Sequence, residues 1–446
     1  MSFNSDMHPR NPYKDNPPDF KSLAIKYPTL RKHCTLGQNG RIHINFREDE
    51  AIRALTHAIF HNDFGLNVDL SSGCLVPRIP QKLNYLLLLE DLLQLNNLTE
   101  RVNGIDIGTG ASCVYPLLGA KRFDWNFVGT DVNPHSIEIA SKNVSQNSLE
   151  QCIETQLVEE DTFFQGVMEK HPDRVFEFSM CNPPFFEQEE TYERFPVQLS
   201  PGKFCNLPDY GATTSRPPPR SSTVAKVNEL ETSGGEESFV LKMIEESIVY
   251  KEKISIFTSM LGKKTSLKPL MQRLHDLPDV KCKNFVLYQG RTHRWVIAWT
   301  FRPNIRLERV SFLLNFSNIL ISEGRNATDV ILNELRKLKI DIIKVNSKYV
   351  CKSACCTWLN LRRKRRLMAT NDDHPKSKRV VGVADGSHND VKTNELCLSD
   401  DDQTKESFHL QFELLLTESS AEFELLQGSK ESLNQLMTCV RSRISK

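Results

Sequence analysis

The sequence predicts an α/β protein centred on a doubly wound, mostly parallel sheet. Between about residues 82 and 302, short apolar runs typical of strands alternate with segments of helical periodicity. A turn with two glycines follows the first of these runs, where such a sheet makes its first strand-to-helix connection. Because single cores stop growing at roughly 250 to 300 residues, a chain of 446 residues should carry further modules. We divide it into residues 1–80, 81–302 and 303–446.

The overall composition does not by itself indicate a nucleic-acid partner. Lys and Arg number 57 and Asp and Glu 56, giving a formal net charge of +1, so a basic surface would have to be local. The first residues show no secretion signal, and no run approaches the ~18 apolar residues of a membrane span. We therefore expect an intracellular protein that makes no contact with a membrane.

The N-terminal region combines a basic segment with a predicted helix. Apolar residues at Ala51, Leu55, Ala58 and Ile59 have helical spacing. The basic residues before them are Arg10, Lys14, Lys21, Lys26, Arg31, Lys32, Arg41 and Arg47. Such a series is most often a solvated face, and it indicates binding only if the next domain acts on a polyanion.

The central region supplies the elements of the sheet in order. A helix over Leu83–Leu95 precedes a strand at Val102–Ile107, and a second strand runs from Asn126 to Thr130. Asn133 is a suitable N-cap for a helix over Pro134–Gln146. The remaining predicted strands are Ile153–Val158, Phe176–Met180, Lys253–Ser259 and a terminal hairpin of Asn284–Gln289 and Trp295–Phe301. The hairpin makes the last strand antiparallel.

Two polar stretches interrupt these patterns. Residues 187–237 are rich in Pro, Ser, Gly and charge, and we predict a flexible substrate loop there. Residues 362–405 lack periodicity and are predicted to be disordered. They divide a C-terminal α+β domain whose predicted elements are Arg309–Ile321, the helix Thr328–Leu338, Ile340–Val350, Phe408–Thr417, Ala421–Leu426 and the helix Ser429–Ile444.

The 12 cysteines are scattered, which favours reduced thiols over a disulfide framework. Cys351, Cys355 and Cys356 form the one cluster, and the nearest further ligand, His374, lies across a charged stretch. Zinc sites need a fourth ligand at suitable spacing. We predict no metal.

The glycine-containing turn predicts a cofactor site. Gly108 and Gly110 allow the backbone to approach a ligand closely, and Asp131 stands about 20 residues on, where a carboxylate can accept both hydroxyls of a ribose. A dinucleotide site would want Gly or Ala at the position of Cys113. With Asp106, these residues favour an adenosyl sulfonium cofactor, S-adenosylmethionine, over a dinucleotide.

The run Asn182-Pro183-Pro184-Phe185-Phe186 predicts the reaction. Two prolines stiffen the chain directly after a predicted strand. The carbonyl groups of Asn182 and Pro183 can accept both hydrogens of an exocyclic amine, whose delocalised lone pair would then turn toward an electrophilic methyl group. Phe185, helped by Phe186, offers a face on which an extruded base can stack. We therefore predict Asn182, Pro183, Pro184 and Phe185 as catalytic.

With these motifs the chain resembles the eukaryotic U6 small nuclear RNA adenine-N6 methyltransferases, the methyltransferase-like-sixteen family, and more distantly the bacterial ribosomal RNA large-subunit methyltransferase F. The resemblance covers about the first 300 residues. It rests on Met7-His8, Arg10-Asn11, Tyr13-Lys14-Asp15, Pro17-Pro18-Asp19-Phe20, Asp63-Phe64-Gly65-Leu66, residues 104–118, 182–186 and 216–221, and Gln289-Gly290-Arg291-Thr292.

The resemblance implies a class I Rossmann-like methyltransferase whose target is an adenine in structured RNA, in U6 and in hairpins of the messenger for S-adenosylmethionine synthetase. Lys82 stands where the family tends to have Arg; it keeps the charge but loses the bidentate fork. The cofactor contacts expected from the turn and the resemblance together are Lys82, Asp106, Gly108, Gly110, Ser112, Asp131, Thr162 and Asn182.

Structured RNA is read through phosphates, shape and splayed bases, so separated basic surfaces should surround the pocket. The predicted RNA-binding residues are Arg10, Lys14, Arg47, Phe186, Lys263, Lys264, Arg291 and Arg294. The basic run Arg362–Arg366 is equally compatible with a nuclear localisation signal, an RNA contact or a solvated segment. The C-terminal region resembles a kinase-associated-one fold, with RNA binding and a protein-interaction or dimerisation role as alternatives. We expect a monomer in nucleus and cytoplasm.

Two other functions remain open from the sequence. A protein glutamine N5 methyltransferase would present the same two amide hydrogens to this loop, but that class usually carries Tyr where Phe185 stands. An RNA-binding regulator with a non-catalytic role would need RNA affinity but no turnover. The intact Asn182–Phe185 run favours an active enzyme.

Overall fold

The structure, a computed structural model, describes residues 4, 6–38, 40–70, 74–184, 186–187, 231–232, 235–290, 292–316, 326–358, 409–417 and 419–444. The chain forms two compact units, Met1–Glu308 and Arg309–Lys446. None of the helices within these ranges combines the length and apolarity needed to cross a membrane.

The N-terminal elements pack onto the central sheet. They are α1 (Phe20–Lys26), α2 (Pro28–Arg31), β1 (Cys34–Leu36), β2 (Ile42–Ile44) and α3 (Asp49–Phe64). The predicted helical periodicity is confirmed, since Ala51, Leu55, Ala58 and Ile59 are all buried along α3. Gly65 ends α3 with a left-handed backbone, a common way for helices to stop. These elements share one apolar core with the helices beside the sheet.

The central sheet has seven strands in the order β10-β11-β9-β6-β3-β4-β5. All neighbours from β9 to β5 are parallel, whereas β11 runs antiparallel to β9, as the predicted hairpin requires. The elements are α4 (Ile79–Leu95), β3 (Asn103–Ile107), α5 (Val114–Phe123), β4 (Asn126–Asp131), α6 (Pro134–Ser145), β5 (Ile153–Leu157), α7 (Gln165–Lys170), β6 (Phe176–Cys181), α10 (Gly235–Ser247), β9 (Ile254–Leu261), α11 (Leu267–Asp276), β10 (Lys281–Gln289) and β11 (Thr292–Thr300). The doubly wound α/β fold is confirmed.

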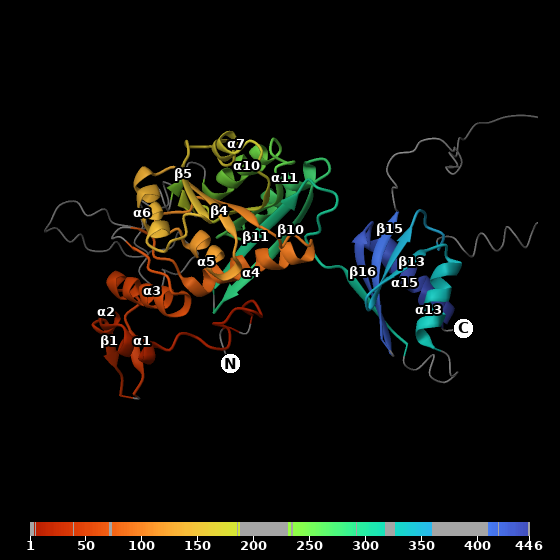
Figure 1. Cartoon of the computed structure of the whole chain (residues 1–446), viewed down its shortest axis with the longest axis horizontal. Coiled ribbons are helices and arrows are strands. Elements are labelled where there is room, and N and C mark those ends of the chain that lie inside the picture. The colour runs from red at the N-terminus through yellow and green to blue at the C-terminus, as the bar shows by residue number, and fades with distance from the viewer. Residues whose placement is uncertain are drawn as a thin grey trace, which may run out of the picture. The chain divides into compact units, whose positions relative to one another are not determined.

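Helices cover both faces of this sheet (Figure 1). One core contains the apolar residues of α3, α4 and α5 together with Ala140 and Val144 of α6. The other contains those of α7, α10 and α11. Gly104 on β3 is required by this packing, because the ring of Phe178 occupies the space that a side chain at residue 104 would need.

The predicted substrate loop over residues 187–237 extends too far at its C-terminal end. Two short strands, β7 (Phe186–Glu187) and β8 (Glu231–Thr232), pair in parallel, and α10 already begins at Gly235. Gly235 has a φ of 69°, which glycine adopts without strain. Residues 188–230 lie outside the described residues.

Within its described residues, the second unit contains a five-stranded antiparallel sheet in the order β12-β16-β15-β14-β13 and the helices α13 and α15. Its elements are β12 (Ser311–Asn315), α13 (Ala327–Lys337), β13 (Asp341–Val345), β14 (Lys348–Ser353), β15 (Leu410–Leu416), β16 (Ser420–Gln427) and α15 (Lys430–Ile444). The single predicted element Ile340–Val350 is wrong: it is a hairpin that turns at Asn346, which adopts a left-handed φ of 56°. The predicted disordered segment, the basic run Arg362–Arg366 and His374 lie outside the described residues.

Candidate active site

The order of the strands brings the predicted site together. Strand β3 lies between β4 and β6, so the connections from β3 and from β6 leave the sheet in opposite directions. Open α/β sheets bind ligands beside the carboxyl ends of the strands at such a switch point. The turn after β3, Asp131 at the end of β4 and Asn182 directly after β6 all lie at this edge.

Asp131 holds the glycine turn. Gly108 and Gly110 have φ values of 70° and 65°, and a side chain at either position would meet only open space. The backbone N–H of Gly110 donates to Oδ2 of Asp131 at 3.0 Å, and that of Asn133 donates to Oδ1 at 2.9 Å. Burial raises the pKa of the Asp131 carboxyl above its usual value. The turn is therefore fixed in a form that leaves room for a ligand over the two glycines.

The Asp106 carboxyl group is buried near the end of β3, two residues before Gly108. It is 1% exposed, and neither of its oxygens has a hydrogen-bond partner among the described residues. Burial raises its pKa to about 7, although the nearby Thr109 hydroxyl and the charge of Lys82 oppose this rise. A buried charge of this kind is costly unless it is paired, so the site suits a ligand with a cationic or hydrogen-bond-donating group.

Lys82, which is half-buried, lies near Asp106. Its Nζ donates to the hydroxyl of Tyr115 at 3.2 Å and stands 4.7 Å from the centre of that ring. Burial lowers the pKa of Lys82 to about 8, the charge of Asp106 opposes this, and the charges of Arg294 and Arg78 add to it. With Asp106 and the open glycine turn, this edge fits a cofactor that carries ribose hydroxyls and an amino-acid end.

The Asn182 loop rests on a buried hydroxyl network. Asn182 is half-buried, Pro183 is buried, and the Asn182 side chain makes no hydrogen bond to the described residues. One residue earlier, the carbonyl of Cys181 lies 3.4 Å from the hydroxyl of Tyr85, which also contacts Thr258 Oγ1 at 2.8 Å. The amide of Asn182 is therefore available to a substrate at the end of a firmly held strand.

The comparisons with known proteins agree with this geometry. A family model described as RNA methyltransferase matches residues 1–303. The chain belongs to this RNA methyltransferase family. The U6 small nuclear RNA (adenine-(43)-N(6))-methyltransferase of Caenorhabditis elegans is 35% identical over 482 aligned residues, covering 100% of both chains. The RNA N(6)-adenosine-methyltransferase METTL16 of Mus musculus is 35% identical, covering 82% of this chain and 70% of the relative.

Solved structures give the same family. The hMettl16 catalytic domain in complex with MAT2A 3'UTR hairpin 6 is 38% identical, with a TM-score of 0.58, and covers 68% of this chain and 100% of that one. The N-terminal domain of human METTL16 in complex with SAH is 35% identical, with a TM-score of 0.52, and covers 66% of this chain and 99% of that one. The predicted Rossmann-like methyltransferase fold is confirmed.

The remaining predicted cofactor and catalytic residues of this RNA methyltransferase lie in several environments. Ser112 is half-buried in the turn before α5. Thr162 is also half-buried, and its hydroxyl donates to the backbone carbonyl of Glu159 at 2.7 Å. Pro184 is half-buried. Phe185 and the side chain of Phe186 lie outside what the structure describes.

The predicted RNA-binding residues lie on several different segments of the first unit. Arg10 is already paired with Glu90 at 2.6 Å and with Asp91, so its charge is partly neutralised. Lys263 and Lys264 follow the end of β9, at the carboxyl edge. Lys14 is half-buried and Arg47 is exposed. The charge of Arg294 acts on Lys82, and Arg291 lies outside the described residues.

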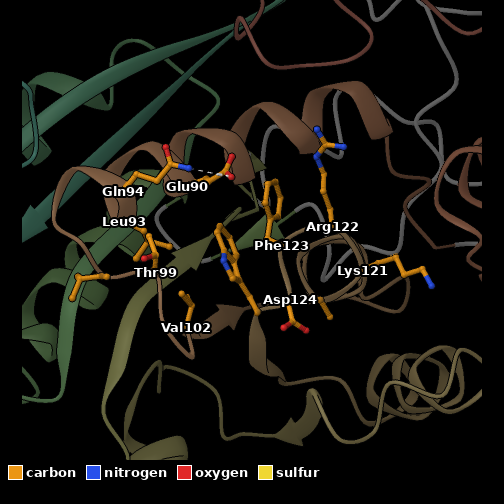
Figure 2. Close-up of a pocket in the computed structure, with 12 residues that line it drawn as sticks. Glu90, Leu93, Gln94, Thr99, Val102, Lys121, Arg122, Phe123 and Asp124 are labelled. Carbon is orange, nitrogen blue, oxygen red and sulfur yellow. Dashed lines mark hydrogen bonds between the residues drawn. The ribbon is translucent and has the colours of Figure 1, made fainter.

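A cavity of about 480 Å³ lies at the opposite edge of the sheet (Figure 2). It is lined by the C-terminal part of α4 and by Lys121, Arg122, Phe123 and Asp124, which lead into β4. A five-residue strand separates the two edges by roughly 16 Å. The lining of this cavity includes none of the predicted site residues, and the candidate active site remains the carboxyl edge.

Proposed function

We propose that this RNA methyltransferase transfers a methyl group from S-adenosylmethionine to the exocyclic N6 of an adenine in structured RNA, U6 small nuclear RNA and messenger hairpins among its targets. The similar proteins are named as U6 adenine-N6 and RNA N6-adenosine methyltransferases. A similar solved domain is described in complex with an RNA hairpin. The proposal extends these activities to this chain.

The residues at the carboxyl edge support S-adenosylmethionine as the cofactor. The cofactor supplies an electrophilic methyl group on a positively charged sulfur. Asp131, which accepts two backbone N–H groups, keeps unused lone pairs for ribose hydroxyls. The unpaired carboxylate of Asp106 suits the amino group of the methionine part, and Lys82 suits its carboxylate. A similar solved domain is described in complex with SAH.

The Asn182 loop supplies the chemistry on the RNA side. The side-chain carbonyl of Asn182 and the backbone carbonyl of Pro183 would accept the two hydrogens of the adenine amine and orient its lone pair. These groups stabilise charge that develops on nitrogen without having to reorganise. The stacking surface assigned to Phe185 would hold the extruded base between aromatic and apolar groups.

One observation carries the proposal. The half-buried Asn182, with no partner among the described residues, ends the strand next to the one whose turn is held by Asp131. An amide acceptor and a ribose-binding carboxylate are thus presented at one edge, as methyl transfer to an amine requires.

The test is transfer of a tritiated methyl group from S-adenosylmethionine to a U6 transcript, followed by digestion to nucleosides. The expected product of the wild-type chain is N6-methyladenosine. Asn182→Ala should reduce the rate by at least about a hundredfold while RNA affinity stays within about threefold. The control Asn434→Ala changes an exposed residue of α15 and should leave the rate unchanged. Wild-type turnover in Asn182→Ala, or label found only in protein, would contradict the proposal.

We further propose that residues 303–446 add RNA affinity, that the chain acts as a monomer without a metal, and that it works in nucleus and cytoplasm. An RNA target made in the nucleus supports the nuclear location, and the basic run Arg362–Arg366 could serve as its signal. Sedimentation of the purified chain with and without a U6 transcript, and fluorescence microscopy of the tagged chain, test these points.

A further inference from the structure

Side-chain amides of α6 and of the turn after it hold the segment after α3 by hydrogen bonds to its backbone. At Asn67, the backbone N–H donates to Oδ1 of Asn147 at 2.8 Å, and the carbonyl accepts from Asn147 Nδ2 at 2.6 Å and from Gln146 Nε2 at 2.7 Å. At Asp69, the backbone N–H donates to Oδ1 of Asn143 at 2.6 Å, and the carbonyl accepts from Asn143 Nδ2 at 3.1 Å. We name residues 67–69 the strap.

Asn143 also reaches the cofactor turn. Its Nδ2 donates a second hydrogen bond, at 3.0 Å, to the backbone carbonyl of Ala111. Ala111 directly follows Gly110, whose N–H is held by Asp131. The two sides of the turn are therefore fixed by different residues, Asp131 at the N–H of Gly110 and Asn143 at the carbonyl of Ala111.

The Asn143 amide has no bonding capacity left. It is fully buried, donates to the carbonyls of Asp69 and Ala111, and accepts from the N–H of Asp69 and from Gln146 Nε2 at 2.8 Å. A primary amide offers two hydrogens and one oxygen with two lone pairs. Every one of these is used, so no other side chain can reproduce the arrangement.

A second contact joins the same parts. The side chains of Cys74, Ala111 and Ile139 form a small buried cluster of their own. Ile139 lies on α6 one turn before Asn143, and Cys74 lies shortly after the strap. Both polar and apolar contacts therefore connect the segment after α3 to α6, and α6 to Ala111.

We propose that Asn143, which is anchored to the strap, is a positioning residue that holds the cofactor turn at the carbonyl of Ala111 and so sets the affinity for S-adenosylmethionine. The inference rests on the proposed function, in which the cofactor lies on the turn. A turn that is already held in its binding conformation binds the ligand more tightly, because binding then loses little conformational entropy of the turn. Loss of the Ala111 bond releases one side of the turn.

Asn147 provides a matched control. It lies four residues after Asn143, in the turn that follows α6, and its amide bonds the strap at Asn67 through both N–H and carbonyl, but no hydrogen bond joins it to Ala111. Asn147→Ala therefore weakens the strap without touching the cofactor turn. Alanine favours helix, so Asn143→Ala does not weaken α6 itself, and Asn147 lies beyond the end of that helix.

The experiment measures binding of S-adenosylhomocysteine by calorimetry to the full chain and its variants. Asn143→Ala should raise Kd about tenfold, and Asn147→Ala should change it less than twofold. In assays with a U6 transcript, Asn143→Ala should raise KM for S-adenosylmethionine about tenfold and leave kcat within twofold. A loss of folded protein would instead lower kcat and leave KM unchanged, so this split separates positioning from damage to the fold.

Two further variants keep the outcomes distinct. Asn143→Asp keeps the side-chain volume and the acceptor for the N–H of Asp69, but it places a carboxylate oxygen against the carbonyl of Ala111. It should also weaken cofactor binding, and it replaces Asn143→Ala as the test if that variant does not fold. Asp131→Ala tests the site itself: unchanged binding there would overturn the proposed function. If Asp131→Ala loses binding while the Asn143 variants match Asn147→Ala, only the positioning role of Asn143 is wrong.

Discussion

The hydroxyl groups of Tyr85 and Thr258 lie 2.8 Å apart inside the molecule, between helix α4 and strand β9. Thr258 donates its own hydrogen to the carbonyl of Ser179 at 2.8 Å, so Tyr85 is the donor between the two hydroxyls. The Tyr85 hydroxyl also lies 3.4 Å from the carbonyl of Cys181. Helix α4 thereby supports the end of the strand from which Asn182 projects.

Tyr85→Phe should therefore slow methyl transfer without removing a contact to either substrate. The ring stays, while the buried hydroxyl that donates to Thr258 is lost, at a stability cost of about 1 kcal/mol. We expect kcat to fall about three- to tenfold and KM for RNA to stay within twofold in steady-state assays. Tyr250→Phe, which removes a hydroxyl after the end of α10, is the control and should keep full activity. Equal kcat values for both variants would show that the network does not position Asn182.

The buried carboxyl of Asp106 should make stability depend on pH. Because its folded-state pKa is raised to about 7, the folded chain holds a proton that the unfolded chain has already released above the ordinary value of 3.8. Stability therefore falls as pH rises from about 4 to 7 and then levels off.

Asp106→Asn removes this titration. The melting temperature of this variant minus that of the wild type should increase from pH 4 to pH 7. The increase corresponds to a difference in the free energy of unfolding of a few kcal/mol at most. Asp173→Asn gives the baseline for removing one exposed charge. A difference that stays flat from pH 4 to 7 would show that Asp106 does not hold its proton.

Glu236 should organise the basic segment after β9. It is 2% exposed at the start of α10, and its carboxylate accepts the backbone N–H of Gly262 and, at 3.2 Å, that of Lys263. Glu236→Gln puts an amide N–H where one of these acceptors stood. We expect Kd for a U6 transcript to rise about three- to tenfold in filter binding, with binding of S-adenosylhomocysteine unchanged.

The neighbouring Glu237 is exposed, so Glu237→Gln removes the same charge without these bonds. It should leave RNA binding within about twofold. If both variants weaken RNA binding equally, the effect comes from charge alone.

Removal of residues 309–446 should weaken RNA binding more than cofactor binding. The first unit is compact by itself, and the boundary between the two units falls between Glu308 and Arg309. If the second unit contacts phosphates, its loss lowers both the affinity and the slope of log K against log salt. Titrations of a U6 transcript at several salt concentrations measure this slope. An unchanged slope would exclude phosphate contacts by residues 309–446.

Local patterns predicted most of the first unit because its elements follow local rules. The predicted strand Asn126–Thr130 is β4 apart from one residue, and Asn133 caps α6 with Pro134 at its first position, as predicted. The hairpin at Asn346 was missed because no Gly or Pro marks the turn. Helix α4 begins at Ile79, before the predicted Leu83, since Pro80 is tolerated in a first helical turn.

The functional contacts between distant residues could not be predicted in this way. Tyr85 and Thr258 are 173 residues apart, and Asn143 and Asp69 are 74 apart. No spacing rule connects such positions, and a buried Tyr or Asn has the same appearance in a sequence as any other. The pairing of Arg10 with Glu90 and Asp91, about 80 residues further along the chain, could not be predicted from spacing either, and its RNA-binding role stays a prediction.

The sequence alone determined the kind of chemistry, because the glycine turn, Asp131 and the Asn182–Phe185 run each carry their meaning within a few residues. Only the tertiary structure decided how these pieces are held and charged. Because β3 lies between β4 and β6 in the sheet, Asp131 and Asn182 come to the same edge. Burial raises the pKa of Asp106 to about 7. Strand order and desolvation depend on the whole fold, so no short segment of sequence contains them.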